Sequence, residues 1–142
     1  MLIKEEVLTA IKNTVGNFLP ETGGIIGQKD GIVCRFYFDD NSESGRAYYY
    51  PSVQTLNETI RKWDEEGCTF CGIVHSHGNQ DFRLSEKDKE LANAILSVNK
   101  DILEYVFFPI VSPATNDQAF SMKIYRIYTK EIKPEPYYID KE

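Results

Sequence analysis

Two histidines one residue apart are the first feature of this sequence that could carry chemistry. His75 and His77 are the only histidines in the chain, and they follow a short apolar segment, residues 69–74. Such a segment predicts a buried strand, and because side chains alternate along a strand, both imidazoles would lie on one face at its end. Ser85 and Asp88 follow after a loop and open a segment with helical periodicity. The sequence therefore predicts two imidazoles at a strand end and a carboxylate on the first turn of the next helix.

Two imidazoles and one carboxylate form a ligand set that suits Zn²⁺. Three protein ligands leave the fourth tetrahedral position to water, which is typical of a catalytic zinc site and not of a structural one. Bound zinc lowers the pKa of that water to about 7. Such a site also needs a general base that is not a ligand, and a donor for the oxyanion that forms on the attacked carbonyl.

A simpler interpretation of Ser85 and Asp88 stays open at this point. Ser-x-x-Asp before an apolar helix also predicts a capping box, in which the serine accepts from helix N–H groups and the acid reaches back. Asp81 is a rival third ligand, since it lies four residues past His77. We place Asp88 ahead of it, because an aspartate that close in a loop is typical of solvated turns.

These residues resemble the signature of a known family. His75-Ser-His77, seven further residues and then Ser85-x-x-Asp88 look like the motif of the JAMM (MPN-domain) zinc metalloproteases, in particular their short stand-alone prokaryotic type. Residues 20–27 are similar to the segment that carries the family's upstream glutamate. Gly78 is a departure, since many members have proline after the second histidine; the glycine loosens the loop.

The resemblance implies a function and a role for each residue. It implies a zinc peptidase or isopeptidase that hydrolyses the C-terminal tail linkage of a ubiquitin-like or sulfur-carrier protein. His75, His77 and Asp88 would bind Zn²⁺. Glu21 would be the general base that takes a proton from the zinc-bound water and returns it to the leaving amine, and Ser85 would steady the tetrahedral intermediate.

Composition narrows the remaining possibilities. The chain has 142 residues, which predicts one domain, residues 1–130, with residues 131–142 as an extended tail. The net charge of −6 without a basic run argues against a nucleic-acid partner. No apolar run approaches the roughly 20 residues that span a bilayer, and the first residues lack a signal pattern, so we expect a cytoplasmic protein with no membrane partner. The oligomeric state stays open.

The cysteines offer a second motif. Cys68 and Cys71 form a C-x-x-C, but the three cysteines of the chain are an odd number and supply no second pair. Residues three apart on a strand face opposite sides. We therefore interpret them as buried strand cysteines and not as a redox or zinc site.

The remaining elements are read from periodicity and turn residues. Asp30-Gly31 between apolar runs predicts a hairpin, and Pro109 predicts an edge strand or a bulge. Helices are expected at residues 2–19 (ended by Pro20), 52–66 and 85–98, and strands at residues 24–28, 32–38, 105–111 and 119–128, besides the strand that ends at the histidines. This order predicts an α/β or α+β fold, a mixed β-sheet covered by helices. It agrees with the MPN/cytidine-deaminase-like layers that the resemblance implies.

Three tyrosines, residues 48–50, allow two interpretations. They could form an edge strand with two rings packed and one exposed, or a ledge that contacts substrate. Residues 39–45 before them predict a polar loop.

Two other functions compete with hydrolysis of a protein tail. A scaffold that keeps the fold but only binds protein would lack a ligand or the base, and none is missing here. The other is a metal hydrolase acting on a small molecule or nucleic acid; a deaminase of this kind would show His-x-Glu followed by Cys-x-x-Cys. Here the Cys-x-x-Cys precedes the histidines and His-x-Glu is absent.

Overall fold

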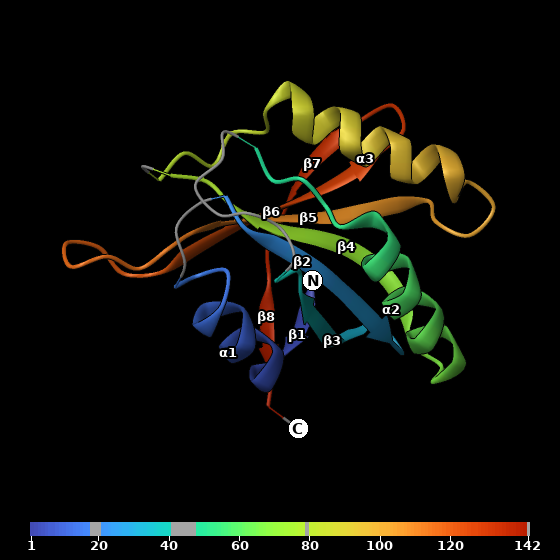
Figure 1. Ribbon diagram of the computed structural model, residues 1–142, viewed down its shortest axis with the longest axis horizontal. Helices are drawn as coiled ribbons and strands as arrows, with labels where there is room; N and C mark the ends of the chain where they lie inside the picture. Colours follow the sequence, from blue (N-terminus) through green and yellow to red (C-terminus); the bar gives the residue numbers. More distant parts are fainter. Residues whose placement is uncertain (18–20, 41–47, 79, 142) are drawn as a thin grey trace.

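A strongly curled mixed sheet of eight strands is the centre of the structure, a computed structural model that describes residues 1–17, 21–40, 48–78 and 80–141 (Figure 1). The strand order is β7-β6-β5-β4-β2-β3-β1-β8. The elements in chain order are β1 (Leu2–Lys4), α1 (Glu5–Asn13), β2 (Gly23–Lys29), β3 (Ile32–Phe38), α2 (Val53–Glu65), β4 (Thr69–Ser76), α3 (Glu86–Val98), β5 (Tyr105–Ser112), β6 (Ser121–Tyr128), β7 (Ile132–Glu135) and β8 (Tyr138–Asp140).

Helices cover both faces of the sheet. Figure 1 shows α1 on one side and α2 with α3 on the other. Each face has its own apolar cluster: Val7 and Ile11 of α1 pack with Val74 of β4, whereas Trp63 of α2 and Leu96 of α3 pack on the opposite face. The predicted α+β class, a mixed sheet covered by helices, is confirmed. No helix among the described residues is long and apolar enough to cross a membrane.

The hairpin and the central strands are confirmed. β2 and β3 are antiparallel, and the turn between them holds Asp30 at φ 54° and Gly31 at φ 79°. Positive φ at both central residues is what a tight hairpin turn requires, and glycine adopts it without steric cost. β4 lies between β2 and β5, so the strand that carries the histidines is in the middle of the sheet.

Both ends of the chain differ from the prediction. Residues 2–4 form a strand, β1, that pairs in parallel with β3 and β8, so the first helix begins only at Glu5 and ends at Asn13. Pro20 lies outside the described residues. Residues 131–142 were predicted as an extended tail; of these, residues 131–141 are described, and β7 pairs with β6 and β8 pairs with β1, so these two strands supply both edges of the sheet. Strand pairing over such separations is invisible to local periodicity.

The placement of Pro109 was also wrong. β5 is an interior strand between β4 and β6, and Pro109 pairs with Ile124 in continuous register. On the other side, the register with β4 is the same before and after the proline, at Phe107 and at Ile110, while Pro109 itself has no partner there. The missing N–H therefore interrupts the ladder at one position and produces no bulge.

The inward face of α3 is shifted from the predicted one. The sequence pattern places Leu91, Ala94, Ile95 and Val98 on one face of this helix. The buried residues are Asp88, Ala92 and Leu96, with Leu91 and Ile95 half-buried beside them, whereas Ala94 and Val98 are exposed. Compared with the orientation expected from the pattern, the helix is rotated about its axis, so that Asp88, its one buried acidic residue, faces the sheet.

A candidate metal centre at the end of β4

The two imidazoles converge as the sequence predicted. The Nε2 atoms of His75 and His77 are 3.0 Å apart, and both side chains are buried. The residue between them points to the other face, where the Ser76 hydroxyl accepts from the N–H of Thr22 at 3.1 Å. The strand alternation therefore produces the imidazole pair and at the same time ties β4 to the start of β2.

Asp88 brings a carboxylate to the same point. Its Oδ1 is 2.9 Å from Nε2 of His75, and its Oδ2 is 3.2 Å from Nε2 of His77. Oδ2 also accepts from the N–H of Ser85 at 2.9 Å, while the Ser85 hydroxyl accepts from the N–H of Asp88 at 3.0 Å. The capping box is thus present. The two interpretations of this motif are compatible, because the cap fixes the carboxylate that faces the histidines.

Glu21 also lies close to the imidazole pair. Its Oε1 is 3.8 Å from Nε2 of His77. Ligand atoms of Glu21, His75 and His77 all lie within 4.8 Å of one another, so these three form a candidate metal-binding group. The backbone at Thr22 is fixed by Ser76, whose N–H donates to the Thr22 carbonyl at 2.9 Å. Two carboxylates, from Glu21 and Asp88, therefore compete as the third ligand.

The close approach of β2 to β4 depends on Gly23. This residue pairs with His75 in the antiparallel ladder. A Cβ at position 23 would lie 2.6 Å from the carbonyl oxygen of Val74 and 2.7 Å from the ring of Tyr49. Only glycine allows this approach, which brings the neighbouring Glu21 within reach of the histidines.

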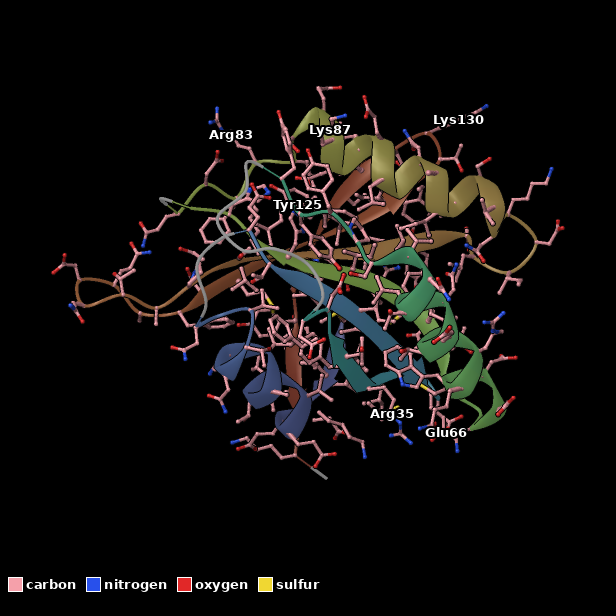
Figure 2. All side chains as sticks on the ribbon, in the orientation of Figure 1. Arg35, Glu66, Arg83, Lys87, Tyr125 and Lys130 are labelled. Atoms are coloured by element: carbon pink, nitrogen blue, oxygen red, sulfur yellow. The ribbon has the colours of Figure 1, made fainter. Side chains whose placement is uncertain are left out.

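The loop after the histidines fixes the orientation of one ring. Nδ1 of His77 is 2.9 Å from the carbonyl oxygen of Asp81, so its hydrogen donates to that carbonyl, and this contact fixes the ring with Nε2 toward the centre. The Asp81 carboxylate instead binds Arg83, so the rival ligand is engaged elsewhere. The Tyr125 hydroxyl donates to the Phe82 carbonyl at 2.7 Å. Figure 2 shows Arg83 on this loop and labels Tyr125, which comes from β6.

Burial and charge shift the ionisation of all four groups. Burial raises the pKa of Glu21 to about 7, although the neighbouring His77 opposes the rise. Burial lowers the pKa of His75. Burial also acts against the charged form of His77, but its contacts with Asp88 and Glu21 outweigh this and raise its pKa. For Asp88, burial is outweighed by hydrogen bonds to His75 and His77, which hold its pKa well below the usual range. The centre thus holds a firmly ionised carboxylate next to a carboxyl that titrates near neutrality.

The donor set fits a small divalent cation. A tetrahedral zinc with bonds of about 2.0–2.1 Å separates its ligand atoms by about 3.3 Å. The separation of 3.0 Å between the Nε2 atoms of His75 and His77 is close to that value, and Asp88 presents one oxygen to each imidazole, Oδ1 to His75 at 2.9 Å and Oδ2 to His77 at 3.2 Å. Among the described residues, no group hydrogen-bonds the buried Nδ1 of His75, so the tautomer of that ring depends on what Nε2 faces.

A cavity of about 290 Å³ opens beside the centre. It is lined by the segment 48–51, by His75, and by Lys87, Asp88, Glu90 and Leu91 at the start of α3. Residues 48–50 form no strand. Tyr49 is buried, while Tyr48 and Tyr50 are exposed, so the predicted edge strand with two packed rings is wrong. Of the predicted loop at 39–45, residues 41–45 lie outside the described residues.

Sequence reasoning missed the part of the site around Tyr49. Its hydroxyl donates to the buried carboxylate of Asp39 at 2.8 Å, and its ring stacks beside His75 with centroids 6.4 Å apart. Nothing in the local pattern indicated this pairing. An aspartate directly after a strand is typical of a turn, and only the buried position in the fold shows otherwise.

Comparison with known proteins gives one family match and similar solved structures. Residues 8–128 match the family described as prokaryotic homologs of the JAB domain. Protein DSY2949 from Desulfitobacterium hafniense has a similar solution structure, with a TM-score of 0.72, 19% identity, and coverage of 99% of this chain and 93% of that one. AF2198, a JAB1/MPN domain protein from Archaeoglobus fulgidus, gives a TM-score of 0.54 at 17% identity, with 98% of each chain covered. No curated protein matches the sequence.

Proposed function

Because this chain belongs to the prokaryotic homologs of the JAB domain, we propose that it is a zinc-dependent peptidase or isopeptidase acting on the C-terminal tail of a ubiquitin-like or sulfur-carrier protein. The observation that carries this proposal is the convergence of two imidazoles and two carboxylates at the end of β4. The family match and the candidate Glu21-His75-His77 group support a metal-dependent hydrolase. The choice of zinc rests on the ligand types, since imidazole and carboxylate in a tetrahedral set suit it.

We assign Asp88 and not Glu21 as the third ligand. Asp88 lies within 3.2 Å of both Nε2 atoms, whereas Glu21 lies 3.8 Å from the nearer one. Its pKa is held well below the usual range, so it carries the full negative charge that a cation needs. Glu21, which burial brings to a pKa of about 7, is better suited to gain and lose a proton.

In the proposed peptide hydrolysis, each residue has a separate role. When bound, zinc would lower the pKa of water and polarise the scissile carbonyl. Glu21 accepts a proton from the attacking water and returns it to the leaving amine. The capping box uses the lone pair of the Ser85 hydroxyl and leaves its hydrogen to donate to the oxyanion on the substrate.

The test is metal analysis combined with the substitution Glu21→Gln. The variant should keep one zinc per chain and lose hydrolysis of a ubiquitin-like fusion by about 10²–10⁴-fold, the typical share of a general base. Glu104→Gln, a change at an exposed residue, is the matched control and should behave as wild type. A Glu21→Gln variant that loses zinc would make Glu21 a ligand. Partner binding without hydrolysis, unaffected by a chelator, would instead indicate a scaffold.

A further inference from the structure

The cavity beside the proposed metal centre has no role in the proposed chemistry. Its volume is about 290 Å³, and it is lined by His75 and Asp88 of the centre, by the irregular segment 48–51 and by the first two turns of α3. Pockets that hold small molecules usually measure about 300–1,000 Å³. This cavity is just below that range, so it has room for one large side chain and not for a larger ligand.

Two tyrosines of segment 48–51 present their rings to solvent. Tyr49 is buried, with 8% of its surface exposed, whereas Tyr48 and Tyr50 are 38% and 53% exposed. The rings of Tyr48 and Tyr50 meet edge to face, with centroids 6.4 Å apart and an interplanar angle of 83°. Exposed aromatic rings that line a cavity are typical of a binding surface, because tyrosine offers a large contact area with few rotatable bonds.

The other lining residues favour an uncharged occupant. Pro51 and Leu91 add apolar surface. The ammonium of Lys87 and the carboxylate of Glu90 are exposed and 3.7 Å apart, so their charges largely cancel. The carboxylate of Asp88 contacts both imidazoles, so its charge is directed to the centre. An aliphatic or aromatic side chain therefore fits this cavity better than a charged one.

The position of the cavity relative to the base indicates which part of a substrate reaches it. Among the described residues, those that line the cavity include neither Glu21 nor His77. In the proposed mechanism Glu21 returns a proton to the leaving amine, so the amine lies at the Glu21 side of the centre. The chain that carries the scissile carbonyl then extends over the side formed by His75 and Asp88, where the cavity is.

We propose that this cavity is a specificity pocket for a large aliphatic or aromatic side chain of the substrate tail, on the carbonyl side of the scissile bond. Tyr48 and Tyr50 form its aromatic wall. The proposal deepens the proposed function and rests on the assigned metal centre and base. The pocket favours tails with a bulky apolar residue near the cleaved bond, because such a side chain buries more apolar surface there than alanine does.

The first experiment compares peptide substrates with the zinc-loaded full chain. The probes are acetyl-Ala-Ala-X and acetyl-Ala-X-Ala, each linked through its carboxyl end to a fluorogenic amine, where X is alanine, leucine, phenylalanine or arginine. In one of the two series, kcat/KM should be at least about tenfold higher for leucine or phenylalanine than for alanine, as expected for added apolar groups in a fitting pocket. Equal values for all four residues, or the highest value for arginine, would overturn the proposal.

The second experiment tests whether the two tyrosines supply this preference. Tyr50→Ala and Tyr48→Ala each remove one ring of the wall, and each should reduce the preference for leucine or phenylalanine over alanine to about twofold or less. Tyr138→Ala, the same change at a tyrosine in β8 that is 64% exposed, is the matched control and should keep the wild-type preference. If both cavity variants also keep it, the pocket is elsewhere and the proposal is wrong.

A binding measurement needs neither a variant nor hydrolysis. The probes are the two peptides with X as para-fluorophenylalanine and with a free carboxyl end, so that no bond remains to be cleaved. On binding to the wild-type chain, the fluorine resonance of one peptide should shift, and nuclear Overhauser effects should connect its ring to those of Tyr48 and Tyr50. If no peptide substrate is hydrolysed but these effects appear, the proposed function fails and the pocket stands. Hydrolysis without any such effect at either tyrosine leaves the proposed function intact and overturns the pocket.

Discussion

Near each end of β4 lies a pair of side chains of a type that binds metals, but the charged groups around the two pairs differ. At one end, Nε2 of His75 and of His77 are 3.0 Å apart; at the other, the Sγ atoms of Cys34 and Cys68 are 3.9 Å apart. Both distances would suit two ligands of one zinc ion. Figure 2 shows Arg35 and Glu66, neighbours of the thiols, at the end of the molecule opposite Arg83 and Lys87.

The surrounding charge distinguishes the two pairs. Asp88 contacts both imidazoles and remains ionised, so the histidine end offers a negative charge to a cation. At the thiol end, burial and the neighbouring Cys34 raise the pKa of Cys68 to about 12, so this thiol stays protonated at neutral pH. A metal ligand must be deprotonated. A metal site therefore needs a negatively charged group that faces the ligand atoms, as well as ligand atoms at the right distance.

The largest expected effect comes from removing that charge. Asp88→Asn should weaken zinc binding by at least about 100-fold, because losing a residue that only hydrogen-bonds a ligand costs about 10–100-fold and Asp88 is itself a proposed ligand. Competitive titration with a chromophoric chelator measures this. Cys34→Ser is the control and should bind zinc as wild type does. If the two variants lose zinc equally, the two ends are not distinct.

The thiol end should instead matter for stability. Cys68 is 1% exposed and packs beside Trp63 over Gly27 in the cluster beneath α2. Cys68→Ser places a hydroxyl in this apolar setting and should lower the free energy of unfolding by about 1–3 kcal/mol. Urea denaturation measures the change, and zinc affinity should not follow it. A variant as stable as wild type would show that the thiol is not part of the core.

The raised thiol pKa predicts a loss of stability in alkali. The pKa of Cys68 is about 12 in the fold against 9.0 as the ordinary value. The unfolded thiol therefore ionises first as the pH rises. The stabilisation is complete below pH 9 and is lost progressively between pH 9 and 12. Over this range, the urea midpoint of wild type should fall more steeply than that of Cys68→Ala. Parallel curves would contradict the assigned pKa.

The smallest effect is expected at the loop after the histidines. Tyr125→Phe removes the hydrogen bond to the Phe82 carbonyl, which restrains the loop that contacts Nδ1 of His77. We expect zinc affinity to fall about twofold to fivefold, less than for the loss of a group that hydrogen-bonds a ligand directly. Tyr128→Phe, on the same strand, is the control. An unchanged affinity would show that the loop keeps its shape without Tyr125, despite Gly78.

The sequence predicted the parts of the site that are close together in the chain. His75, His77 and Asp88 follow from strand alternation and a helix start, and both rules are local. The role of Glu21 came from the family resemblance, because the spacing of residues does not show that β2 pairs with β4. Asp39 and Tyr49 were missed, since their contact depends on how an irregular segment folds back over the sheet.

The errors in the fold have the same origin. β1 and β8 pair with each other although they lie at opposite ends of the chain. Ile3 is fully buried. The two strands that pair with its strand are too distant in the sequence to influence a local pattern around it. The sequence around Ile3 is equally compatible with the start of the following helix. Pairing with distant strands determines that these residues form a strand. Pro109 was placed at an edge by a general rule, but an interior strand tolerated the loss of one ladder hydrogen bond.

X-ray absorption at the zinc edge of the zinc-loaded protein shows at which end of β4 the metal binds. Binding at the histidine end predicts nearest neighbours of nitrogen and oxygen at about 2.0–2.1 Å with the outer-shell pattern of two imidazoles, unchanged in Cys34→Ser. Sulfur neighbours at about 2.3 Å would instead place the metal at the thiol end, and the proposed site would then be wrong.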